Sequence, residues 1–164
     1  MSTANKHLSY YDPASVPDGK GMRVALVVSE WNGEITEALR QGAFDTLTHH
    51  GVLPDDIVTS RVPGSFELAL AAQLAIEGTR VDGVICIGSV VRGETPHFDL
   101  VCQATAQGIM QVGLKTGRPV IFCVLTDDTM EQARARSGGK HGNKGVDCAI
   151  ACLKMIGLAR KGLR

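Results

Sequence analysis

Hydrophobic positions follow two alternating patterns along the chain. Short apolar runs occur at 23–29, 56–62, 81–91 and 119–125, separated by longer segments in which apolar residues recur every three or four positions. A short continuous apolar run is typical of a strand buried on both faces, whereas the longer period is that of a helix. Strands that alternate with helices in this way predict an α/β fold with a four-stranded parallel sheet, covered by helices on both faces and joined by right-handed crossovers.

The helical segments differ in how much apolar surface they carry. Periodicity predicts helices at about 35–50, 67–77, 98–115, 129–136 and 145–158. The second of these is rich in Ala and Leu on most sides, so we expect it to be buried.

Residues 1–22 lack a periodic apolar pattern and carry several Pro and Gly residues among polar ones. They predict an extended N-terminal arm, of a kind that often packs on a neighbouring subunit. Residues 23–164 then form a single α/β domain, since 164 residues with 44% hydrophobic content suffice for one core.

The charge balance and the hydrophobic runs exclude several classes of protein. Lys plus Arg equals Asp plus Glu at 17 each, so no overall positive field favours nucleic acid. The basic tail at 160–164 is expected to be solvated and frayed, with a binding arm as the alternative. There is neither an apolar run near the ~20 residues of a membrane helix nor a signal-peptide core, which predicts a soluble, cytoplasmic protein without membrane contact.

The chain has five cysteines, an odd number, placed mostly in apolar surroundings. We interpret them as reduced, small hydrophobic side chains. Cys148 and Cys152 are spaced to share a helical face, but no third ligand at suitable spacing accompanies them, so a zinc site is disfavoured.

The segment from Gly88 to Phe98 is the strongest candidate for a functional loop. It joins the end of a buried strand to a Gly-rich turn carrying His97, and open α/β sheets bind ligands at the carboxyl ends of their strands. The alternative is that His97 only caps the next helix. Glu94 stands where a P-loop requires Lys, and no G-x-G-x-x-G follows the first strand, so nucleoside triphosphatase and dinucleotide-binding functions are disfavoured.

Other strand ends add aromatic and polar groups at the same predicted edge. Trp31, the only Trp, directly follows the first strand, where it could stack on a planar heterocycle or, alternatively, fill the core. The turn at 63–67 leaves helix N-terminal N–H groups free for a ligand's polar edge. Glu67 there would bind ligand hydroxyls or simply complement the helix dipole.

Arg136 precedes a Gly-rich loop, 138–145, that contains two lysines, a His and an Asn. This composition suits an anion such as phosphate, held by an Arg fork rather than by a wrapped P-loop. The alternative is a flexible helix end with solvated charges.

Taken together, these segments resemble the lumazine synthases, transferases of the penultimate step of riboflavin biosynthesis, from about residue 23 to 158. The resemblance rests on their order and separation: Trp31-Asn32, Pro63-Gly-Ser-Phe-Glu67, the Gly88–Phe98 loop, Phe122, and Arg136 followed by Gly142-Asn-Lys-Gly-Val-Asp147. It implies a three-layer α/β/α sandwich in a flavodoxin-like arrangement. It also implies condensation of 5-amino-6-(D-ribitylamino)pyrimidine-2,4-dione with 3,4-dihydroxy-2-butanone 4-phosphate, without cofactor or metal.

The same resemblance implies a role for each matching residue. The pyrimidine would lie against Trp31, with Asn32 and Glu67 binding the ribityl chain and Arg136 the phosphate. The remaining substrate-binding positions, some using backbone groups only, would be Ser65, Phe66, Ser89, Val90, Val91, Glu94, Thr95, Lys144 and, from an adjacent subunit, Phe122. His97 would shuttle protons, because an imidazole both accepts and donates near neutrality, while the ring amine forms an imine, phosphate is eliminated and ring closure expels water.

The resemblance further implies a homopentamer. The turn at 138–145 carries no insertion, and in the family this short turn favours an icosahedral shell of pentamers, with riboflavin synthase as a candidate partner. The principal alternative is a non-catalytic flavin- or lumazine-binding relative that keeps the pocket without turnover.

Overall fold

A parallel sheet of four strands forms the centre of the computed structural model, which describes residues 7–162. The strands β1 (Val24–Ser29), β2 (Ile57–Val62), β3 (Gly83–Val91) and β4 (Val120–Asp127) lie in the order β2-β1-β3-β4. The predicted strand positions are thus confirmed to within a few residues, as is the parallel, flavodoxin-like order.

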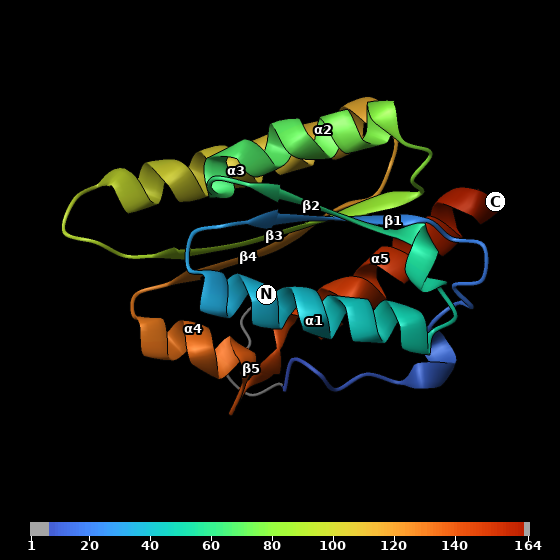
Figure 1. Cartoon of the computed structure of the whole chain (residues 1–164), viewed down its shortest axis with the longest axis horizontal. Coiled ribbons are helices and arrows are strands. Elements are labelled where there is room, and N and C mark those ends of the chain that lie inside the picture. Colours follow the sequence, from blue (N-terminus) through green and yellow to red (C-terminus); the bar gives the residue numbers. More distant parts are fainter. Residues whose placement is uncertain (1–6, 163–164) are drawn as a thin grey trace.

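Helices cover both faces of this sheet (Figure 1). Helices α2 (Leu68–Gly78) and α3 (His97–Thr116) lie on one face, and α1 (Gly33–His49), α4 (Met130–Arg136) and α5 (Lys144–Lys161) lie on the other. The predicted three-layer α/β/α sandwich is therefore confirmed. All strands run the same way, so their carboxyl ends share the edge from which α1, α3 and α4 begin.

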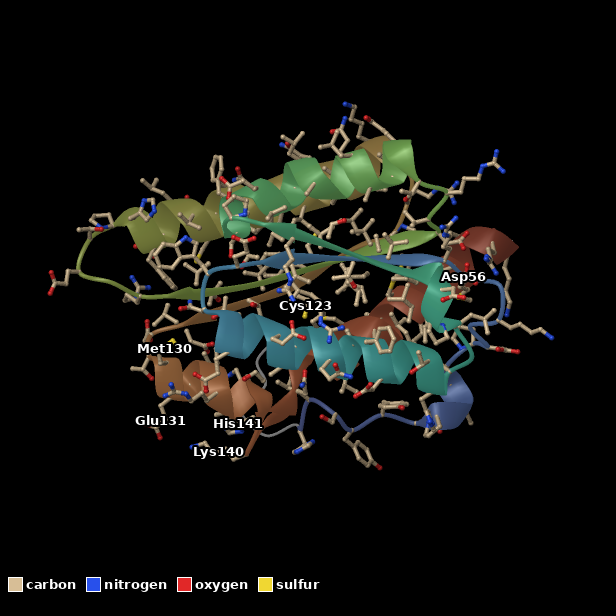
Figure 2. All side chains as sticks on the ribbon, in the orientation of Figure 1. Asp56, Cys123, Met130, Glu131, Lys140 and His141 are labelled. Carbon is tan, nitrogen blue, oxygen red and sulfur yellow. The ribbon has the colours of Figure 1, made fainter. Side chains whose placement is uncertain are left out.

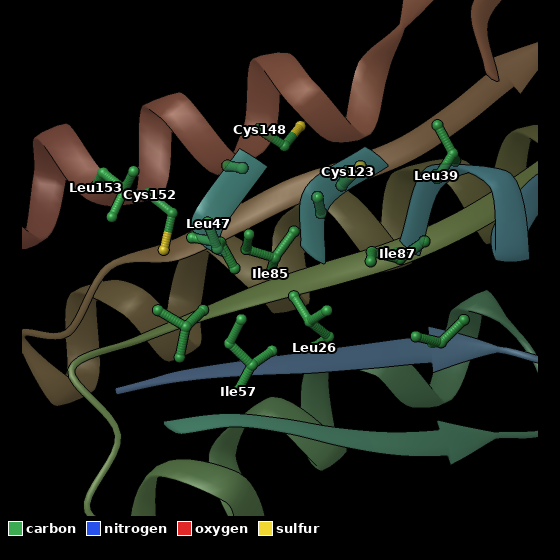
Figure 3. Packing of buried hydrophobic residues seen from close by; sticks show 14 of the residues in the cluster. Leu26, Leu39, Leu47, Ile57, Ile85, Ile87, Cys123, Cys148, Cys152 and Leu153 are labelled. Carbon is green, nitrogen blue, oxygen red and sulfur yellow. The ribbon is translucent and has the colours of Figure 1, made fainter. Parts of the chain in front are cut away.

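Two hydrophobic cores sandwich the sheet, because residues on successive strand positions point to opposite faces. Leu26, Ile85 and Ile87 pack against α1 and α5 (Figure 3), whereas Val27, Val84 and Cys86 face α2 and α3. Strand β1 is buried along its whole length, which explains why its sequence reads as a continuous apolar run.

The prediction that helix α2 is buried on most sides is wrong for the single chain. Only Leu68 and Ala72 are buried, whereas Leu70 and Leu74 are exposed on the outer surface. The reason is geometric: α2 lies in an outer layer, so within one chain its sides toward β3 and α3 are covered and its remaining side is not.

The loop at 138–145 contains a small hairpin that periodicity did not predict. Strands β5 (Ser137–Gly139) and β6 (Gly142–Asn143) pair antiparallel before α5 begins. Asn143 fixes the junction, since its side chain accepts from the Gly145 N–H and donates to the Ala38 carbonyl at 2.9 Å. A Cβ at Gly145 would overlap the Leu39 carbonyl oxygen, so this glycine allows α5 to approach α1 closely.

Residues 7–22 form the described part of the arm and lack regular structure apart from the turn η1 (Pro13–Ser15). They pack on their own chain: the Leu8 N–H donates to the His141 carbonyl at 2.8 Å, and Tyr11 bonds His50 at 3.0 Å. Residues 1–6 of the predicted arm lie outside the described residues.

The basic tail is more ordered than predicted. Helix α5 continues through Lys161 rather than ending near Leu158, and Arg160 donates to the Gly21 carbonyl at 2.6 Å and pairs with Asp82 at 2.8 Å. The expectation of a frayed tail is therefore wrong up to this point, because Arg160 finds hydrogen-bonding partners in Gly21 and Asp82, which are far from it in the sequence. Residues 163–164 lie outside the described part.

Candidate functional site

A pocket of about 570 Å³ opens at the carboxyl ends of β1, β2 and β3. This volume suits a small organic ligand. Most of the predicted site residues line it together with Gly64 and Val101, namely Trp31, Asn32, Ser65, Phe66, Glu67, Ser89, Val90, Val91 and His97.

Two exposed aromatic side chains give the pocket its apolar character. Trp31 is 72% and Phe66 63% exposed, so the alternative of Trp31 as a core residue is wrong. Exposed aromatic faces beside a cavity can stack on a planar ring and lose water when they do so.

Asn32 lines the pocket at the junction of β1 and α1. It is the one described non-glycine residue with a positive φ, 55°, a conformation that Asn tolerates better than most residues. Its side-chain amide donates to the Ser89 carbonyl at 3.0 Å, and this bond ties the end of β1 to β3.

The turn before α2 approaches β3 very closely. A Cβ at Gly88 would lie 2.6 Å from the Ser65 hydroxyl oxygen, so glycine is required there. The buried hydroxyls of Ser65 and Ser89 have no hydrogen-bonding partner among the described residues. Beside them, Glu67 precedes α2 without capping it and lines the pocket, which favours the ligand-binding interpretation of this carboxylate.

His97 is the first residue of α3 and an exposed wall of the pocket. Pro96 occupies the N-cap position and no side chain caps the helix, so the capping alternative for His97 is wrong. The loop leading to it is anchored by Arg92, which lies over the Phe98 ring at 4.2 Å and donates to Asp128 at 2.8 Å.

Five predicted site residues do not line this pocket. Glu94 and Thr95 are exposed in the loop between β3 and α3. Phe122 is half-exposed on the edge strand β4, whereas Arg136 ends α4 and Lys144 begins α5 on the opposite side of the sheet. A single chain therefore does not bring all the predicted residues together.

The charges of that second group are paired within the chain. Arg136 lies 3.5 Å from Asp127 and Lys144 lies 2.5 Å from Asp147, so the alternative of freely solvated charges is wrong for these two residues. Burial, opposed by the charge of Arg136, raises the pKa of Asp127, and the nearby Asp128 adds to the rise. Burial, the largest single influence, lowers the pKa of Lys144, but the hydrogen bond to Asp147 and the charges of Cys148, Asp147 and Cys123 together outweigh it, so the pKa of the lysine is raised.

The hairpin lies against the C-terminal end of α4, because the His141 N–H donates to the Ala135 carbonyl at 2.8 Å; Figure 2 labels His141 and Lys140 beside this helix. The hairpin thus places basic side chains in the same region as Arg136. Among residues 7–162, no group of three His, Cys, Asp or Glu side chains is arranged to hold a metal ion. None of the described helices has both the length and the apolar character that crossing a bilayer requires.

Comparison with known proteins agrees with this arrangement. A family model described as 6,7-dimethyl-8-ribityllumazine synthase matches residues 21–160. The chain belongs to this family. The family match covers every strand of the sheet, the pocket, and the α-helices except for the last residue of α5.

Curated relatives match over nearly their full lengths. The 6,7-dimethyl-8-ribityllumazine synthase of Porphyromonas gingivalis is 54% identical over 98% of this chain and 99% of its own length. Proteins of the same name from Christiangramia forsetii and Parabacteroides distasonis are 50% and 51% identical, over 98% and 95% of this chain and 96% and 98% of their own lengths.

Sequence reasoning missed two contributors to this region. Val101 lines the pocket one turn after His97, which helical spacing from the loop would have indicated. Asp127 faces Arg136 only because α4 folds back beneath β4, and no local sequence signal reports that contact.

Proposed function

We propose that this protein is a 6,7-dimethyl-8-ribityllumazine synthase that condenses 5-amino-6-(D-ribitylamino)pyrimidine-2,4-dione with 3,4-dihydroxy-2-butanone 4-phosphate. The observation that carries the proposal is the pocket in which Trp31, Glu67 and His97 meet at one sheet edge, in a chain of this family. The relatives described above have this name, and they match this chain over nearly their whole length.

The ring amine attacks the ketone and forms an imine as water leaves. Phosphate is then eliminated, and attack of the second nitrogen closes the ring with loss of another water. His97 would accept and return the protons of these steps, a role supported by its exposed place on the pocket wall. Holding both substrates together supplies further acceleration, since effective molarities reach roughly 10⁵ M or more.

We further propose that a second copy of the chain completes the site. Phe122, Arg136 and Lys144 would come from the neighbour, because they lie away from the pocket of their own chain. The uncovered apolar side chains of α2 and α3 support association, since patches of this kind mark interfaces; they include Leu70, Leu74, Leu100, Met110 and Leu114.

The assembly we propose is a pentamer, and a shell of pentamers because the β5–β6 hairpin is short. Riboflavin synthase remains a candidate partner of such a shell. All five cysteines are free thiols, which supports a reducing compartment, and we propose the cytoplasm. Light scattering in phosphate buffer that detects only free pentamers would contradict the shell.

Steady-state turnover tests the proposed activity. Purified protein incubated with both substrates should release inorganic phosphate and form the fluorescent lumazine at equal rates. Each substrate alone is the control. Tight lumazine binding without turnover would instead identify a non-catalytic lumazine-binding protein.

A further inference from the structure

Asp127 is the last residue of β4 and is only 7% exposed. Its Oδ1 lies 3.5 Å from Nη1 of Arg136, while its other oxygen, Oδ2, is buried without a hydrogen-bonding partner among the described residues. A carboxylate that stabilises a fold normally makes charge-assisted bonds near 2.7–2.9 Å and satisfies both oxygens. Asp127 does neither, so a structural role explains it poorly.

The neighbouring carboxylate shows the contrast. The Asp128 carboxylate accepts a bond from Nε of Arg92 at 2.8 Å, and its backbone N–H donates to Oε1 of Gln132 in α4 at 2.9 Å, both on the exposed side. Asp128 therefore fixes loop structure at little desolvation cost. Asp127, one residue earlier, is held buried beside an arginine that it contacts only loosely.

Arg136 retains one free edge for a ligand. Its Nη1 faces Asp127 and donates to the Gln132 carbonyl at 3.1 Å. Within residues 7–162, no acceptor is bonded to its Nε or Nη2, and the side chain is 30% exposed. The guanidinium is thus held from one side, and its other donors remain available to an anion.

We propose that Asp127 competes with the phosphate group for Arg136. In the empty site the Asp127 carboxylate offsets the charge of Arg136, and this keeps phosphate binding weak. The proposal rests on the proposed function, in which Arg136 binds the phosphorylated substrate. A phosphate dianion that reaches the guanidinium is repelled by the buried carboxylate, and this repulsion is strong because little water screens it. Asp127 is therefore a specificity and positioning residue that favours release of the inorganic phosphate product.

The variant Asp127→Asn tests this role, since it removes the charge and keeps the size. We expect the Kd of the assembled protein for inorganic phosphate, measured by calorimetry, to fall about tenfold. The KM for the butanone phosphate should fall in the same direction, whereas the KM for the pyrimidine should not change. Asp128→Asn is the matched control, because it removes the same charge one residue away, and it should change phosphate affinity less than about twofold.

Weaker or unchanged phosphate binding by a folded Asp127→Asn variant would overturn the proposal and leave Asp127 as a structural support of Arg136. Failure of both wild type and variant to bind phosphate would overturn it as well. If Asp127→Asn does not fold, Asp127→Ser provides the same neutral test in a smaller side chain. Phosphate binding is measured without turnover, so an inactive wild-type protein would refute the proposed function, whereas an active one with unchanged phosphate affinity in the variants would refute only this role of Asp127.

Discussion

At the carboxyl ends of the strands, the functional groups on the two faces of the sheet differ in exposure and in charge pairing. On the α2/α3 side, Trp31, Phe66 and His97 stand exposed around an open pocket. On the α4/α5 side, Arg136 and Lys144 are paired with carboxylates of their own chain. An exposed aromatic pocket gains free energy when a ring covers it, whereas a cation beside a carboxylate attracts an anion less strongly because the carboxylate offsets its charge. One chain thus presents an open aromatic pocket on one side of the sheet and charge-paired basic groups on the other.

The largest effect should come from the pocket side, at His97. Replacement by Ala should lower kcat about 10²–10⁴-fold, because acid–base assistance is lost while the pocket remains. Turnover measured at saturating concentrations of both substrates checks this, and a thermal unfolding curve controls for folding. Unchanged kcat would remove His97 from the mechanism.

A smaller and more selective effect is expected on the other side. Arg136→Ala should raise the KM for the butanone phosphate roughly ten- to a hundredfold, since charge-assisted hydrogen bonds contribute about 1.5–3 kcal/mol. The KM for the pyrimidine should change little. The exposed Arg134, which pairs with Glu34 at 2.9 Å, offers a matched control in Arg134→Ala. Equal changes for both substrates in Arg136→Ala would show that Arg136 maintains the shape of the site instead of binding phosphate.

The smallest effect is expected at Trp31, where substitution should affect the pyrimidine rather than the butanone phosphate. Trp31→Ala should raise the KM for the pyrimidine about three- to tenfold, because a stacked aromatic pair contributes roughly 0.5–1.5 kcal/mol beyond burial. Trp31→Phe keeps an aromatic face and should stay near wild type. If Trp31→Ala affects only the butanone phosphate, the assignment of the pocket to the pyrimidine is wrong.

The sheet and most of the pocket could be predicted because their signals are local. The apolar run of β3 and the Gly-rich turn after it lie within a few residues of His97. The β5–β6 hairpin could not be predicted in this way, since Asn143 stabilises it through the distant Ala38 carbonyl. The contact of Asp127 with Arg136 likewise depends on how α4 packs, and not on a spacing in the sequence.

Burial of α2 illustrates a second limit. Its apolar sequence predicts a covered helix, yet Leu70 and Leu74 are exposed in the single chain. A hydrophobic pattern predicts that a helix surface is buried. It does not indicate whether the residues that bury it come from the same chain or from another copy. The apolar sequence of α2 therefore predicts that the helix is covered, without indicating which chain covers it.

In the proposed assembly two copies of the chain share each site, and mixed assemblies reveal whether they do. Co-expression of His97→Ala with Arg136→Ala, each carrying a different tag, yields assemblies in which some interfaces combine an intact His97 with an intact Arg136 from the neighbour. If the site is shared, assemblies carrying both tags, assayed at a butanone phosphate concentration well below the wild-type KM, should regain about a quarter of wild-type activity by random mixing of subunits. Activity no higher than the mean of the two separate variants would contradict the account and mean that each chain carries its own complete site.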